Sequence, residues 1–145
     1  MSITEKILAI VLLLFLLLLF FWAILVSLPP YKKFRRDLIS GFRQARAQSI
    51  KLQSMLKNYI EENNAAGKKF TEDMTYGNYY KYLKSNYISY LSNKNYSRVK
   101  TSYNPIVQLQ LYRTLKQQKS WLNDAEDKLY NTLNNPDGQI SVKYH

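Results

Sequence analysis

The stretch ILAIVLLLFLLLLFFWAILVSL, residues 7–28, is apolar except for Ser27, and it decides the fold class. At about 1.5 Å of rise per residue, a helix of this length spans roughly 33 Å, close to the hydrocarbon thickness of a bilayer. Backbone groups find no water there, so a single spanning segment must be helical. We therefore expect an N-terminal transmembrane anchor over residues 1–31, followed by a small domain on its C-terminal side.

A cleaved signal peptide is the alternative interpretation of this segment. Signal peptides have an apolar region of about 7–15 residues between a basic head and a small-residue cleavage site. Here Glu5 and Lys6 cancel in the head, the apolar run is longer, and residues 25–27, Leu-Val-Ser, lack the small-x-small pattern. The sequence therefore favours a retained anchor.

Cations follow the apolar run and predict its orientation. Pro29 and Pro30 are expected to end the membrane helix, because both lack a backbone donor. Directly after them the sequence YKKFRR, residues 31–36, carries four cations, whereas the opposite flank has one lysine. The positive-inside bias then places the N-terminus outside and the C-terminal domain in the cytoplasm or the mitochondrial matrix. We expect the same cations to bind anionic lipid head groups; they are Lys32, Lys33, Arg35 and Arg36.

Net charge is +11, and all of the excess follows the apolar run. From Met74 to Asn123 the sequence has eight cations and no acidic residue. Arg43 and Arg46 are expected either to extend the juxtamembrane basic cluster or to meet an acidic neighbour. The chain contains no cysteine, which rules out disulfides and thiolate metal sites.

Periodicity after the anchor predicts three helices, so we expect an all-α fold with a small antiparallel, coiled-coil-like three-helix domain over residues 32–138. The first helix covers about residues 31–63, the second starts with Thr71 as N-cap, residues 92–102 form a loop, and Asn104-Pro105 opens the third. Apolar stripes predict the buried faces. They comprise Phe34, Leu38, Phe42, Ala45, Ser49, Leu52, Leu56 and Tyr59 in the first helix; Met74, Tyr76, Tyr80, Leu83, Tyr87, Tyr90 and Leu91 in the second; and Leu111, Leu115, Gln118, Leu122, Ala125, Leu129 and Thr132 in the third.

The third helix is expected to end near Asn134, before a turn at residues 135–138. Residues 139–145 alternate apolar and polar side chains. This C-terminal tail either adds a strand to a partner or is disordered.

Thirteen tyrosines are the second distinctive feature, and eight of them lie between Tyr76 and Tyr103. They can be half-buried helix residues, a protein interface in which tyrosine buries area at small entropic cost, or stacking platforms for nucleic-acid bases. The interface interpretation assigns partner binding to five residues: Tyr79, Tyr80, Tyr82, Tyr87 and Tyr90.

The sequence contains few residues that are candidates for catalysis. The single histidine is the final residue, His145, and no phosphate-binding glycine motif occurs. We expect no catalytic residues, no metal and no cofactor. The anchor contains no ionisable residue between Lys6 and Lys32, so it offers no ion path of its own.

These features lead to a functional expectation without assigning the chain to a family. We expect a non-enzymatic single-pass membrane protein, an accessory or scaffold subunit of a larger membrane complex. Its partners would be other protein subunits and anionic lipids, with no small-molecule substrate. The alternative is a membrane-tethered nucleic-acid-binding protein, because cations and tyrosines interleave in the acid-free stretch.

Overall fold

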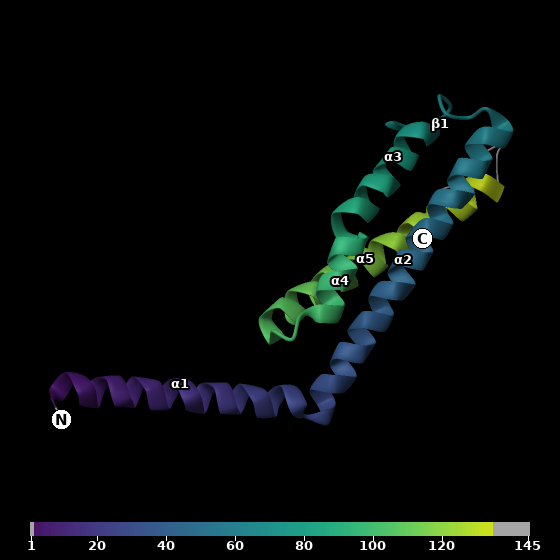
Figure 1. Cartoon of the computed structure of the whole chain (residues 1–145). Coiled ribbons are helices and arrows are strands. Elements are labelled where there is room, and N and C mark those ends of the chain that lie inside the picture. The colour runs from purple at the N-terminus through teal and green to yellow at the C-terminus, as the bar shows by residue number, and fades with distance from the viewer. Residues whose placement is uncertain (1, 135–145) are drawn as a thin grey trace, which may run out of the picture. The chain divides into compact units, whose positions relative to one another are not determined.

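The computed structural model describes residues 2–134, and nearly all of them are helical (Figure 1). The elements follow in the order α1, α2, β1, β2, α3, η1, α4 and α5. The chain divides into two compact units, the first ending at Leu38 and the second beginning at Ile39. The predicted tail, residues 139–145, and the predicted turn at residues 135–138 lie outside the described residues.

The helix α1, Ile3–Ser27, confirms the predicted N-terminal apolar helix. The Ser2 side chain accepts from the Glu5 backbone, and the Glu5 side chain accepts from the Ser2 backbone, which satisfies two amides that a helix start leaves without partners. None of the α1 side chains is buried within the chain. By length and composition α1 can cross a membrane, a property that a signal sequence near an N-terminus shares.

The paired prolines follow the end of α1, as predicted, and they also begin the next helix, which was expected from about residue 31. Leu28 is extended and caps α1, and α2 then runs over Pro29–Asn63. Proline fits the first turn of a helix because its missing N–H has no helical acceptor there. The apolar stripe of α2 is confirmed at six buried positions: Leu38, Phe42, Ala45, Ser49, Leu52 and Leu56.

The second predicted helix begins later than expected. Residues 69–75 form a short antiparallel hairpin from β1, Lys69–Thr71, and β2, Met74–Thr75, so Thr71 lies in a strand and is not an N-cap. The Thr75 hydroxyl instead accepts from the Asn78 backbone, and α3 covers Tyr76–Asn86. A π-helical turn, η1, follows over Tyr87–Leu91.

The loop predicted for residues 92–102 is wrong. This segment forms α4, Asn93–Thr101, whose N-cap Ser92 accepts from the backbone of Asn95. Asparagine and serine have low helix propensity, and Val99 is the buried side chain of α4, so the apolar pattern was weak. The expected single second helix is therefore an arm made of α3, η1 and α4.

The last helix, α5, covers Pro105–Asn134 and begins where predicted. Asn104 accepts from the Ile106 backbone at 2.9 Å, and Pro105 occupies the first helical position. Buried positions recur in steps of three and four, as the seam predicted; they are Gln108, Leu111, Leu115, Gln118, Leu122, Ala125 and Leu129.

Side-chain pairs give the helix directions within the second unit. Lys119 donates to Gln44 and Lys51 to Glu126, a constant offset of 75 residues, so α2 and α5 run parallel. The arm runs antiparallel to α2, because Tyr59 contacts Tyr76 near the start of the arm and Arg43 contacts Tyr96 near its end. Figure 1 shows the α4–α5 connection at the opposite end of this unit from the hairpin.

A glycine sets the spacing of the two parallel helices. A Cβ added to Gly41 would lie 2.6 Å from Leu115 Cδ2, well inside ordinary carbon contact. Glycine has low helix propensity, but at position 41 the lack of a side chain lets α2 approach α5 closely.

Candidate interaction surfaces

The predicted lipid-binding residues lie on the first two turns of α2. Lys32, Lys33 and Arg36 are exposed, whereas Arg35 is half-buried. Three of the four cations are therefore solvated and accessible to an anionic head group. Lipid binding itself stays a prediction.

The five predicted partner-binding tyrosines separate into three environments. Tyr79 is only 8% exposed and belongs to the core, so its ring packs within the domain. Tyr80 and Tyr87 are half-buried, while Tyr82 and Tyr90 are exposed. The stripe predicted for α3 is confirmed at Tyr76 and Leu83, but it is wrong at Tyr80, because Tyr79 is the buried ring there. Partner contact stays a prediction for the accessible tyrosines.

Aromatic rings connect the hairpin to three helices. Phe70 of β1 stacks on Tyr79 at 4.3 Å between ring centroids and contacts Tyr76 at 5.2 Å. Tyr76 in turn lies 5.1 Å from Tyr59 of α2. At the other end of this row Tyr82 contacts Tyr79 and meets Trp121 of α5 edge-on, 5.6 Å away. Phe70, Tyr76 and Tyr79 are buried, so these three rings contribute to the core beside the hairpin.

Burial changes the ionisation of two of these phenols. Burial, with a hydrogen bond to Tyr59, raises the pKa of Tyr76 to about 12. Burial also raises the pKa of Tyr79. Both rings stay neutral at physiological pH, as core residues require.

A cluster of arginines and tyrosines joins α2 to η1 and α4. The Arg46 guanidinium donates to Tyr87 Oη at 3.0 Å and to Asn93 Oδ1, and its Cζ lies 4.7 Å from the Tyr96 ring centroid. Arg43 Nε donates to Tyr96 Oη at 3.4 Å. Lys100 Nζ lies 4.8 Å from the same ring. These cation–π contacts and hydrogen bonds hold α4 against α2.

Among residues 2–134, neither Arg43 nor Arg46 pairs with an acidic side chain, which was one of the two expectations for them. The partners that the structure gives Arg43 and Arg46 are neutral oxygens and rings. The hydrogen bond from Arg43, together with nearby cations, lowers the pKa of Tyr96. The sequence did not reveal this site, because Tyr96 fell in the segment predicted as a loop.

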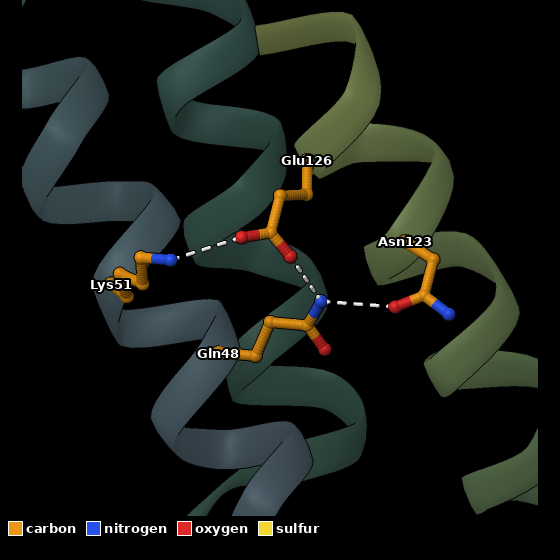
Figure 2. A network of polar contacts seen from close by, with 4 residues as sticks. All are labelled: Gln48, Lys51, Asn123 and Glu126. Carbon is orange, nitrogen blue, oxygen red and sulfur yellow. Dashed lines mark hydrogen bonds and ion pairs between the residues drawn. The ribbon is translucent and has the colours of Figure 1, made fainter. Parts of the chain in front are cut away.

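A polar network crosses the interface of the parallel helices (Figure 2). Gln48 Nε2 donates to Asn123 Oδ1 at 3.0 Å and to Glu126 Oε2 at 2.7 Å, while Lys51 pairs with Glu126 Oε1 at 3.0 Å. The bonds from Gln48 and then Lys51 lower the pKa of Glu126. The bond to Glu126 raises the pKa of Lys51. This network connects α2 and α5 at one relative register of the two helices.

Two buried glutamine side chains on the α5 seam each have an amide oxygen without a hydrogen-bond partner. Gln108 Nε2 donates to the Ser102 carbonyl, but Gln108 Oε1 has no hydrogen-bond partner. Gln118 Oε1 also lacks one. A buried polar group at a seam position can specify register at some expense of stability.

Within residues 2–134, no three His, Cys, Asp or Glu side chains come together as a metal site. His145 lies outside that range. Comparisons with protein-family models, curated proteins and solved structures find no match to this chain. The interaction surfaces above are therefore the basis for assigning a function.

Proposed function

We propose that this chain is a non-catalytic single-pass membrane protein, an accessory or scaffold subunit whose helical domain packs on neighbouring subunits. In this proposal α1 stays in the bilayer and the domain faces the cytoplasm or the mitochondrial matrix. The domain is an up-down-up bundle of α2, the α3–α4 arm and α5, with a coiled-coil-like seam. The basic residues at the start of α2 contact anionic lipid.

The exposed apolar surface of η1 is the observation that carries the proposal. Ile88 is 60% exposed, and Tyr90 beside it and Tyr82 on α3 are exposed as well. Single-turn π-helices occur frequently at functional sites, and exposed tyrosine is typical of protein interfaces. The hydrogen bond from Arg46 to Tyr87 joins η1 to α2 and supports this surface from behind.

Native extraction tests the proposal directly. The tagged full chain is extracted in mild detergent, sized, and analysed by mass spectrometry for chains present at constant stoichiometry. We expect a complex that the Ile88→Ser/Tyr90→Ser variant loses and that Tyr130→Ser keeps, since Tyr130 is exposed on α5 eleven residues past Lys119, away from the level at which Arg46 binds η1. A monodisperse monomer with a cooperatively unfolding domain would contradict the proposal.

A tethered nucleic-acid binder is the second candidate, and the acid-free stretch favours it. Against it, Tyr79 lies in the core, where its ring is not accessible for stacking on a base. Binding of the full chain to single-stranded RNA should then weaken steeply with salt, with a slope of about −0.7 per phosphate contact. Tyr82→Ala would remove about 1–3 kcal/mol of stacking. Binding confined to very low salt and insensitive to Tyr82→Ala would eliminate this candidate.

A further inference from the structure

Charge is unequally divided along the helical unit. Two contacts mark a cross-section of this unit, because each joins α2 to a neighbouring element at nearly the same height. Lys119 of α5 contacts Gln44, and Tyr87 of η1 contacts Arg46. The entry half, residues 39–46 and 87–119, lies on the side where the chain enters the unit. It contains eight cations and no acidic residue. The far half, residues 47–86 and 120–134, contains seven cations and seven acidic residues. The excess positive charge of this unit thus lies at one end.

The same end exposes apolar side chains on α5. Ile106 is 69% exposed and Leu109 is 47% exposed, and they are three residues apart on one face. Arg113 and Lys116 continue along this face and are exposed. In the far half of α5 the exposed positions carry mainly polar and acidic side chains, including Asp124 and Asp127. One helix therefore changes from apolar and basic to polar and acidic along its length.

Close packing in the unit places this face at its end. Leu115 lies against Gly41, and α5 runs parallel to α2, so residues 105–114 extend from that level toward the end of the unit at which Ile39 begins. α4 ends on the same side, because Tyr96 is level with Arg43 and the helix continues to Thr101. Arg98 on α4 is exposed there too.

We propose that the entry half is a second membrane-contact surface, in which Ile106 and Leu109 enter the interface of an anionic bilayer while Arg98, Arg113 and Lys116 bind its head groups. Apolar side chains flanked by cations are the chemistry of interfacial membrane binding. The charge selects an anionic surface, and each cation close to it strengthens the contact about fivefold. The proposal goes beyond the subunit function and shares with it only the retention of α1 in a membrane.

A site-specific fluorophore tests this contact. Because the sequence contains no cysteine, Leu109→Cys and Ile50→Cys each give a single labelling site, and the two native side chains are similarly exposed, at 47% and 49%. The labelled full chain is reconstituted in vesicles of phosphatidylcholine with phosphatidylglycerol, or of phosphatidylcholine alone. Lipids with a nitroxide near the head group serve as quencher.

We expect quenching at position 109 in the anionic vesicles and little at position 50. Raising salt from about 0.1 to 1 M shortens the Debye length from about 10 to 3 Å and should remove most of the quenching at 109. The triple variant Arg98→Gln/Arg113→Gln/Lys116→Gln should do the same. The matched control Lys81→Gln/Lys84→Gln/Lys128→Gln, with cations of the far half, should not.

Equal quenching at positions 109 and 50 in chains that float with the vesicles would overturn the proposal and leave the subunit function intact. If the fluorophore at position 109 is instead shielded in a way that depends on protein concentration and not on lipid charge, the surface binds a second copy of the chain. That result would also overturn the membrane-contact proposal. If alkaline carbonate extracts the chain from the vesicles, α1 does not span the bilayer, and both proposals are refuted. Loss of the co-purifying subunits with quenching retained would refute the subunit function alone.

Discussion

Gly41→Ala tests the close approach of the two parallel helices. In an exposed helix this change stabilises by about 0.5–1 kcal/mol through lower backbone entropy of the unfolded chain. Here the new methyl carbon would lie 2.6 Å from Leu115 Cδ2, and overpacking of this kind costs about 1–3 kcal/mol. We expect a net destabilisation of about 0.5–2 kcal/mol.

A double-mutant cycle separates the clash from the propensity. Leu115→Ala alone should cost about 2–5 kcal/mol, since Leu115 is buried in the α5 seam. In the Gly41→Ala background its cost should fall by about 1 kcal/mol, because the new methyl group occupies part of the vacated space. That coupling exceeds the additivity error of about 0.3–0.5 kcal/mol expected for independent sites.

Guanidinium unfolding in detergent provides the measurement. The sequence has two tryptophans, so a Trp22→Phe background leaves Trp121 of α5 as the reporter of the helical unit. Gly67→Ala is the matched control, because no atom lies within 4 Å of its added Cβ. A Gly41→Ala variant that is more stable than the parent and additive with Leu115→Ala would refute the α2–α5 contact.

Three further predictions concern single groups. Gln118→Leu should stabilise the unit by about 1 kcal/mol in the same unfolding assay, because it removes a buried oxygen without a partner. The lowered pKa of Glu126 implies stability that is present above its unfolded pKa and lost as pH falls through the folded value, and Lys51→Gln should flatten that part of the stability–pH profile. The pKa of Tyr76, about 12, is above that of an unfolded tyrosine, so stability should decline between about pH 10 and 12, and an ultraviolet titration of Tyr76→Phe should lack the late-ionising phenol.

Residues with periodic apolar spacing and clear end signals could be located from sequence. The α2 stripe from Leu38 to Leu56 and the α5 seam from Leu111 to Leu129 were predicted position by position, and both are buried. Pro105 marked a helix start because proline fits the first turn, and the pair Pro29-Pro30 marked the end of α1. In these helices local preference and burial favour the same structure.

The arm between α2 and α5 could not be derived in the same way. Thr71 and Thr75 are both plausible N-caps, and the choice depends on the hairpin pairing of Thr71 with Met74. A π-helical turn adds a residue to one turn and so changes the spacing of the expected stripe: Leu91 is buried as predicted, whereas Tyr90 is exposed. No local pattern in the sequence predicts a π-helical turn.

Long-range contacts with arginine explain why α4 is helical despite its composition. Its sequence, NKNYSRVKT, offers one buried aliphatic residue, so isolated helix formation is unfavourable. Arg46 and Arg43, about fifty residues earlier, bind Asn93 and Tyr96 and supply the missing interactions. Arg43 and Arg46 also supply two of the eight positive charges of the entry half, so they contribute both to the folding of α4 and to the charge proposed to attract anionic lipid. Replacing them would therefore disturb fold and surface together, which is why exposed Arg98, Arg113 and Lys116 give the cleaner test of membrane contact.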